Sequence, residues 1–378
     1  MLLHSQPSTV RCLTSRTREL AYRASVTSTR KSLHSLGHIF GRKRGARAMA
    51  QTPDAPTFDV PPAPWDPADE SITSEDIGNV VSFEHVNLEV PDLEIARLFF
   101  CEGLGLTLDP SRIGAQRGGM NVLWMNVGKQ QFHICKGPVA QRLPTPGSAI
   151  GLVLPNLPAV AAQLEQLREL IGNVKVAYIT PEVLQVTDPH GQCYMVHAHS
   201  QFPNFAADRG IVYLQLPCFV GTAAEIARFY STLLGSPIRV RTQDQQQAGQ
   251  PIQAEVNMGH PGTKLIFQER KELGSTFTEK DVLRLFSGWH MAFYVADFSG
   301  TYSRLRPLLF NNHPYKDKVY NFKDALNFHQ YRFQDIVQLP ASGTLEDRKG
   351  GSLPVLYRIS HECRSTAHPN FLRCLFNR

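Results

Sequence analysis

The chain of 378 residues lacks several features that would place it in a common class of protein. It has no run of about 18 apolar residues, so no segment is predicted to span a membrane. Its seven cysteines are scattered without a CxxC pair, which is typical of reduced thiols rather than of a disulfide framework. The sequence also has no GxxxxGK[ST] phosphate loop, no GxGxxG after a strand and no GxSxG nucleophile elbow.

Acidic residues are almost absent from the first 50 residues, which contain eight Arg and two Lys against one Glu. The remaining chain is therefore mildly acidic, and its charge gives no general case for nucleic-acid binding. The segment 1–50 is rich in Arg, Ser and Thr, which is typical of an organelle transit peptide, and its small residues near 46–50 offer a cleavage region. We expect a chloroplast, with a mitochondrion as the alternative destination. A disordered basic tail is the other interpretation.

Residues 51–80 are rich in Pro and acidic side chains, and we expect a linker there. Beyond this linker the same pattern occurs four times: a short apolar strand, a turn, an amphipathic helix, and two or three further strand-like runs. The first strands carry, at comparable positions, His85, Ala149, Tyr213 and His290. Such a period indicates duplicated supersecondary units, which we number 1 to 4 in chain order.

The motifs of these units resemble a known superfamily. HVNLEVPDLEIARLFF, YLQLPCFVGTAAEIARFYSTLLG, HMAFYVADF and the turn DPHGQ resemble the vicinal oxygen chelate superfamily, which includes glyoxalase I, bleomycin-resistance proteins and extradiol dioxygenases. The resemblance implies an α+β fold with two vicinal-oxygen-chelate domains, each a pair of βαβββ units forming a curved sheet around a cavity. We expect the domains at 81–200 and 208–366, followed by a C-terminal arm at 367–378.

In that superfamily a divalent metal is held by residues from the first and last strands of the two units in one domain. The first expected domain offers His85 and His133, but also Ala149 and Met195, which are not ligand types. His197 lies two residues beyond Met195 on the same strand face. We therefore expect a metal site of His85, His133 and His197 for Fe, Zn, Mn or Ni, with a metal-free polar pocket as the alternative.

The second expected domain offers Tyr213, Ile266, His290 and Arg358 at the same positions. A phenol, an imidazole and a guanidinium facing one cavity favour an anionic or oxygen-rich organic ligand, since Arg can bind a carboxylate through two parallel hydrogen bonds. Alternatively, Arg358 pairs with Glu362 or Asp335 in a surface network. His361 and Glu362 are adjacent, so in a regular strand they point to opposite faces and cannot both coordinate one ion.

Two functions from different classes follow. One is an organellar glyoxalase- or dioxygenase-like metalloenzyme (a lyase, isomerase or oxygenase) that acts on a small oxygenated organic molecule. The other is a metal-free ligand-binding or interaction module that retains the fold, because a fold alone does not choose a function. Both interpretations have a small-molecule partner, no nucleic acid and no membrane, and either a monomer or a homodimer.

The expected transit peptide has a direct test. Deleting residues 1–50 should leave folding intact and abolish organelle import, because the predicted address lies outside the predicted domains. Import into isolated chloroplasts and mitochondria, together with a thermal melt of the shortened chain, measures both effects. A shortened chain that fails to fold would contradict the expected boundary.

Overall fold

A computed structural model describes residues 78–114, 119, 121–241, 251–309, 319–345 and 352–377. The predicted transit peptide and nearly all of the predicted linker lie outside the described residues. Within the described part, no helix is both long enough and apolar enough to cross a membrane. All described residues fall into a single compact unit of the chain.

The four repeated units are present in the structure. Unit 1 comprises β1 (Val80–Val90), α2 (Leu93–Arg97) with the π-helical turn η2 (Leu98–Gly103), β2 (Thr107–Leu108), the short turn η3 (Pro110–Arg112), β3 (Val122–Val127) and β4 (Gln130–Lys136). Unit 2 comprises β5 (Ala149–Val153), α4 (Leu157–Ile171), β6 (Lys175–Thr180), β7 (Val183–Thr187) and β8 (Cys193–His197), and is followed by η4 (His199–Gln201).

The second half of the chain repeats this order. Unit 3 comprises β9 (Gly210–Cys218), α5 (Ala223–Leu234), β10 (Ile238–Arg241), β11 (Gln253–Asn257) and β12 (Lys264–Glu269), and η6 (Lys271–Leu273) and α6 (Glu279–Leu285) follow it. Unit 4 comprises β13 (His290–Val295), α7 (Phe298–Leu305), η7 (Arg306–Leu308), α8 (Phe322–Phe328), β14 (Gln330–Val337) and β15 (Val355–Ser365).

The helix of unit 1 begins where its sequence predicts. The side chain of Asp92 accepts hydrogen bonds from the backbone amides of Glu94 and Ile95, at 2.8 and 3.2 Å. These are two of the amides that a helix start leaves without a partner, so Asp92 is the N-cap. The strand before it, β1, alternates as expected, because Val86 and Leu88 lie in the hydrophobic core.

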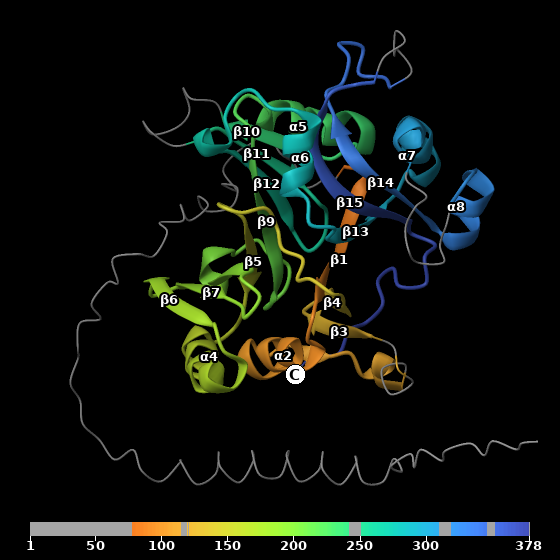
Figure 1. Cartoon of the computed structure of the whole chain (residues 1–378). Coiled ribbons are helices and arrows are strands. Elements are labelled where there is room, and N and C mark those ends of the chain that lie inside the picture. Colours follow the sequence, from red (N-terminus) through yellow and green to blue (C-terminus); the bar gives the residue numbers. More distant parts are fainter. Residues whose placement is uncertain are drawn as a thin grey trace, which may run out of the picture. The chain divides into compact units, whose positions relative to one another are not determined.

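The strands form two sheets, and the expected α+β fold with paired units is confirmed (Figure 1). Sheet A has the order β14-β15-β13-β1-β4-β3-β2, and sheet B has the order β10-β11-β12-β9-β5-β8-β7-β6. In every unit the first and last strands are parallel neighbours. The two units of a sheet meet at their first strands, which run antiparallel: β1 with β13 in sheet A, and β9 with β5 in sheet B.

The pairing of units differs from the expectation. We expected consecutive units to share a sheet, but unit 1 shares sheet A with unit 4, and unit 2 shares sheet B with unit 3. The ranges 81–200 and 208–366 therefore each contribute strands to both sheets. Periodicity could not decide this point, because all four first strands have similar apolar patterns, and hydrogen bonding along a strand edge does not depend on chain order.

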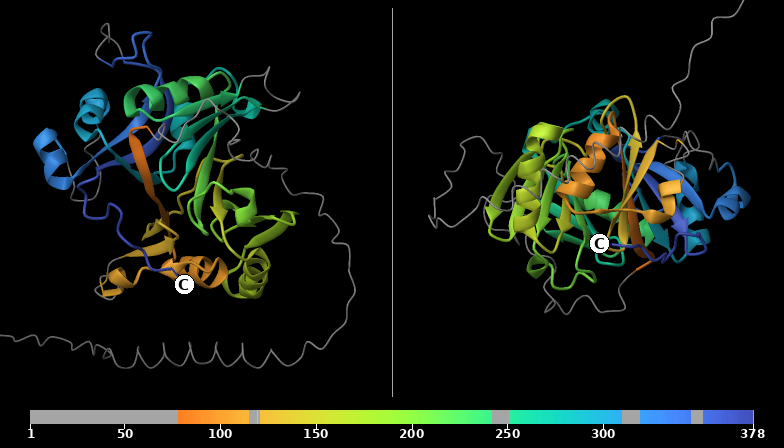
Figure 2. Two further views of the ribbon diagram at one scale, coloured as in Figure 1. Left: turned by 180° about the vertical axis from the view of Figure 1, so that it is seen from behind. Right: turned by 90° about the horizontal axis from the view of Figure 1, so that it is seen from below.

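The hydrophobic core lies between the two sheets, where the helices of the units pack (Figures 1 and 2). The hydroxyl of Tyr230 in α5 forms a 2.7 Å hydrogen bond with Nε2 of His361 in β15. This bond joins unit 3 to unit 4. The imidazole of His361 is fully buried and stacks on Phe333, with ring centroids 4.1 Å apart. This face of β15 thus joins the two sheets, while Glu362 points to the other face, as the strand alternation predicted.

The buried histidine makes the stability of the fold depend on pH. Burial lowers the pKa of His361 to about 3, so it stays neutral in the folded chain while the unfolded chain takes up a proton near pH 6.5. Its contribution is complete above about pH 6.5 and is lost as the pH falls toward 3. One such histidine should reduce the free energy of unfolding by ~2 kcal/mol between pH 7 and pH 5.

The double variant His361→Phe, Tyr230→Phe removes this group without leaving an unpaired phenol. Urea denaturation measures the free energy of unfolding at pH 7 and at pH 5. Its decrease from pH 7 to pH 5 should be smaller by ~2 kcal/mol in the double variant than in the unaltered chain. Replacing the exposed His199 by Gln is the control and should leave the loss unchanged. Equal losses in all three proteins would contradict the assignment.

Candidate metal centre

A β-bulge in β1 brings two polar side chains to one face of sheet A. Phe83 pairs with Phe293 and His85 pairs with Ala292, so Glu84 is an extra residue on β1. An extra residue interrupts the alternation of a strand, and Glu84 and His85 therefore lie on the same face, while Phe83 points to the core. Glu84 and His85 are both buried.

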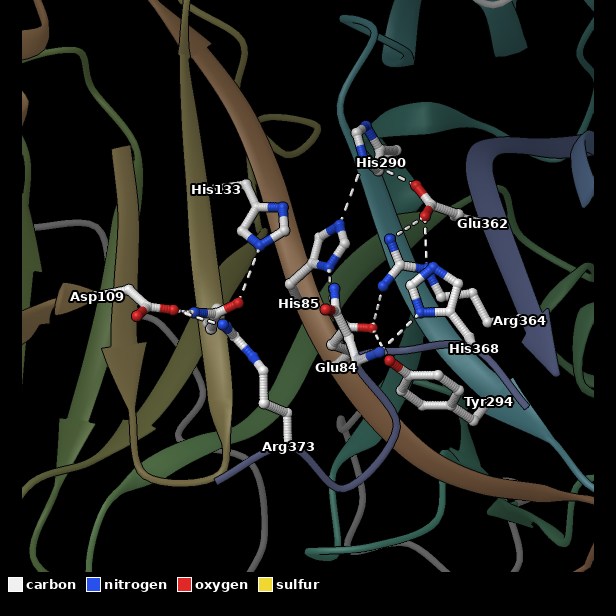
Figure 3. A network of polar contacts seen from close by, with 12 residues as sticks. Glu84, His85, Asp109, His133, His290, Tyr294, Glu362, Arg364, His368 and Arg373 are labelled. Carbon is white, nitrogen blue, oxygen red and sulfur yellow. Dashed lines mark hydrogen bonds and ion pairs between the residues drawn. The ribbon is translucent and has the colours of Figure 1, made fainter. Parts of the chain in front are cut away.

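Three histidines and two carboxylates meet at this bulge (Figure 3). The ring of His133 from β4 stacks on His85, with centroids 3.7 Å apart. Nε2 of His85 lies 3.4 Å from Nε2 of His290 in β13, and the latter nitrogen lies 3.6 Å from Oε2 of Glu362 in β15. Among the described residues, two groups have ligand atoms close enough to hold an ion, and both contain His85: one with Glu84 and His133, the other with His290 and Glu362.

The spacing of the nitrogens of His85 and His290 fits a divalent transition-metal ion. Two nitrogen ligands bound tetrahedrally at about 2.05 Å lie ~3.3 Å from one another, which is close to the observed separation of His85 and His290. Burial, reinforced by the neighbouring His85, lowers the pKa of His133, so this imidazole is neutral and keeps a lone pair for coordination. Imidazole and carboxylate ligands together suit Zn, Fe, Mn or Ni.

Two buried arginines hold the carboxylates of the site. Arg332 lies 2.5 Å from Oε2 of Glu362, and Nε of Arg364 donates to Oε1 of Glu362 at 2.6 Å. Arg364 also pairs with Glu84, which accepts a hydrogen bond from the hydroxyl of Tyr294. Burial alone would raise the pKa of Glu362, but the two guanidinium groups outweigh it and lower that pKa. Two positive charges thus balance two negative charges in the interior.

The structure separates the residues that the sequence assigned to one metal site. It brings His85 and His133 together, but His197 lies in β8 of sheet B, where its Nε2 is 2.9 Å from the hydroxyl of Tyr213. The expected set of three histidines is therefore wrong: in sheet A, His85 has His133 and Glu84 on one side and His290 and Glu362 on the other.

The ligand contacts expected in the second domain are also divided. His290 faces His85 in sheet A, whereas Tyr213 is buried in sheet B. Arg358 pairs with Asp335 at 2.5 Å and with Glu279 at 3.5 Å. The surface-network alternative therefore describes Arg358, and the expectation that Tyr213, His290 and Arg358 face a common cavity is wrong.

Sheet B repeats the geometry of sheet A without its chemistry. Gly151 pairs with Tyr213 and Leu152 with Ile211, so Val212 is bulged in β9 just as Glu84 is in β1. The strand registers place the following residues of sheet B where His85, His133, His290 and Glu362 stand in sheet A: Tyr213, Ile266, Ala149 and Met195. These four belong to a separate apolar cluster that fills the hollow of sheet B.

Sequence reasoning missed Glu362 because it placed Arg358 at the fourth position. The insertion before β15 hid the turn from which the strand position was counted. A usable signal lay at the end of the strand: Glu362 precedes the last three residues of β15, much as Met195 precedes the last two residues of β8. Glu84 had no comparable signal, because a bulge in β1 appears only when its partner strand is known.

A cavity of about 550 Å³ adjoins the candidate metal centre. Glu84, Gln131 and Tyr294 line it on the side of sheet A. Its other walls come from the loop around Ala207, from His260 and from the end of the chain beyond β15. A space of this size accommodates a small organic molecule.

Comparisons with known proteins find similarity only among solved structures. No family model matches the chain, and no curated protein matches it. Among solved structures, glyoxalase I from Zea mays is 11% identical, with a TM-score of 0.45, and the match covers 77% of this chain and 94% of that chain. A 4-hydroxymandelate synthase mutant from Streptomyces coelicolor is 14% identical, with a TM-score of 0.26, over 76% of this chain and 93% of that chain.

Another solved structure matches a shorter part of the chain. A glyoxalase/bleomycin resistance protein from Albidiferax ferrireducens is 16% identical, with a TM-score of 0.23, and the match covers 31% of this chain and 97% of that chain. These are the kinds of protein that the sequence motifs resemble. The fold itself follows from the strand order of the two sheets.

The apolar filling of sheet B has a testable consequence at Gly151. A Cβ atom there would lie 2.4–2.5 Å from the ring of Tyr213, too close for ordinary contact. Gly151→Ala should therefore lower the free energy of unfolding by ~1–3 kcal/mol, the usual cost of overpacking. In a Tyr213→Ala background the same substitution should have little effect, and denaturant melts of the four proteins measure both values. Equal costs in the two backgrounds would contradict the close packing.

Proposed function

We propose that the protein binds a divalent transition-metal ion through His85, His133, His290 and Glu362 and acts on a small oxygenated organic molecule in the adjoining cavity. One observation carries the proposal. All four ligand types occupy the first and last strands of the two units of one sheet, whereas the four equivalent positions of the other sheet hold none.

The charge of the site indicates the kind of molecule it would accept. A bound divalent ion acts as a Lewis acid that polarises carbonyl or enolate oxygens. The arginines and glutamates already balance one another, so an ion would give the site a net positive charge. Such a site favours an anionic or easily ionised oxygen group. Tyr294, whose hydroxyl is held by Glu84, lies at the boundary between this site and the cavity.

The same balance of charges supports the second candidate, a metal-free site for a small ligand. Glu84 and Glu362 are paired with Arg364 and Arg332 without any ion, so the fold does not need a metal to satisfy its buried carboxylates. In that case the histidines would serve as hydrogen-bonding groups for the ligand. Metal content decides between the two candidates.

Metal analysis of protein purified without added ions is the test. We expect about one ion per chain and its loss from His290→Ala during the same purification, because removing a ligand should weaken binding by more than the roughly 10- to 100-fold lost with a residue behind a ligand. His197→Ala in sheet B is the matched control: it also removes a buried histidine, but should retain the ion. A chelator should lower the melting temperature of the unaltered protein and of His197→Ala only.

Protein that contains no ion, or an ion that His290→Ala retains, would exclude the metalloenzyme and leave the metal-free site.

From the composition of residues 1–50 we further propose that the protein acts in the chloroplast, with the mitochondrion as the second possibility. The import experiment described above tests this destination independently of the metal.

A further inference from the structure

The C-terminal arm, described to Asn377, runs from β15 past β13 and β1 of sheet A to unit 1 (Figure 1). Its Phe371 packs on Tyr294, with ring centroids 4.9 Å apart. Further along, the amide side chain of Asn377 donates to the backbone oxygen of Gly128 at 2.8 Å and accepts from its backbone nitrogen at 2.9 Å. The arm, which follows β15 of unit 4, is therefore attached to unit 1 at the other end of the sequence.

Between these two anchors the arm contacts a buried polar network. Arg373 donates to Oδ2 of Asp109 at 2.6 Å, and the same oxygen accepts from Nε2 of Gln131 at 2.9 Å. Nε2 of Gln131 also lies 2.6 Å from Oδ1 of Asn126, whose Nδ2 donates to the backbone oxygen of Phe376 in the arm. Asp109, Asn126 and Gln131 are all at most 3% exposed. Two routes thus run from the arm to Gln131.

This network determines which way the amide of Gln131 points. Asp109 is an anion, because hydrogen bonds from Ser111 and Arg373 lower its pKa although burial acts in the opposite direction. A carboxylate only accepts hydrogen bonds, so the nitrogen of the Gln131 amide faces Asp109. The oxygen of the amide then faces Nε2 of His133, at 3.2 Å (Figure 3).

The orientation of Gln131 in turn selects the tautomer of His133. An amide oxygen cannot donate, so Nε2 of His133 carries the proton and Nδ1 of the neutral ring keeps the lone pair. If the amide turned over, its nitrogen would face Nε2, and the proton would have to move to Nδ1. Partners of this kind fix the tautomer and the ring orientation of a histidine ligand.

We propose that the C-terminal arm is a working part of the metal centre: through Asp109 and Gln131, Arg373 orients His133 for coordination. Arg373 and Gln131 are positioning residues, since neither belongs to the groups of ligand atoms. This inference rests on the proposed function. It adds that the affinity for the ion depends on the last residues of the chain.

Binding of Co²⁺, followed by its visible absorption in competition with a chelator, is the test. Arg373→Ala should weaken binding roughly tenfold, the lower end of the usual effect of a residue behind a ligand. Arg373→Lys should restore part of the affinity, because an ammonium group can still pair with Asp109. Leu372→Ala is the matched control within the arm: this side chain is 72% exposed, and its loss should leave binding unchanged.

Asp109→Asn separates orientation from simple shielding by the arm. The amide of Ser111 holds one oxygen of residue 109, so the new amino group would face Gln131 and favour the turned amide. We expect weakened Co²⁺ binding in Asp109→Asn and no additional loss when Arg373→Ala is added, because both changes break one chain of contacts. The ¹⁵N NMR signal of His133 should show the tautomer with the proton on Nε2 in the unaltered chain and in Leu372→Ala, and should lose it in Asp109→Asn.

Each outcome separates the two proposals. If the unaltered protein takes up no Co²⁺, the proposed metal centre fails and the role of the arm fails with it. If the unaltered protein binds Co²⁺ and Arg373→Ala or Asp109→Asn binds it equally well, only the role of the arm is overturned. Fully additive losses in the double variant would mean that the arm shields the site without orienting His133, and would also overturn the inference.

Discussion

The antiparallel contact between β1 and β13 is the interaction on which the candidate site depends. It joins the first unit of the chain to the last, and its register places His85 beside Ala292 and within reach of His290. The bulge at Glu84 lies in the same contact and brings a second carboxylate to the same face. A register shifted by one residue would turn these polar side chains into the apolar core.

The two sheets show how one backbone geometry supports two different interiors. In sheet A the hollow holds histidines, glutamates and arginines, whose burial is offset by mutual hydrogen bonds and by the balance of charge. In sheet B the equivalent positions carry apolar side chains and Tyr213, which packs on Gly151. One repeated architecture thus contains a polar interior in sheet A and an apolar interior in sheet B.

The units and their internal order could be predicted from the sequence, because strand alternation, the cap at Asp92 and the helix patterns are local signals. The placement of His85 and His133 on one face of neighbouring strands was predicted from the same signals. The pairing of units could not be predicted, since it depends on contacts between residues far apart in the chain. Because consecutive units were expected to pair, His197 was assigned to the metal site with His85, and His290 was assigned to the other domain. Glu362 was noticed but not assigned, because an insertion obscured its strand position.

The contact between the ends of the chain also affects how the protein is made. Glu84 and Arg364, which pair within the site, are 280 positions apart in the sequence. Unit 1 leaves the ribosome long before β13 has been synthesised. The edge of β1 that pairs with β13 therefore has no partner during much of translation. Contacts of such long range slow folding and leave partly folded chains open to association. Nascent or prematurely terminated chains therefore lack the polar interior altogether, and a finished C-terminus becomes a condition for any chemistry there.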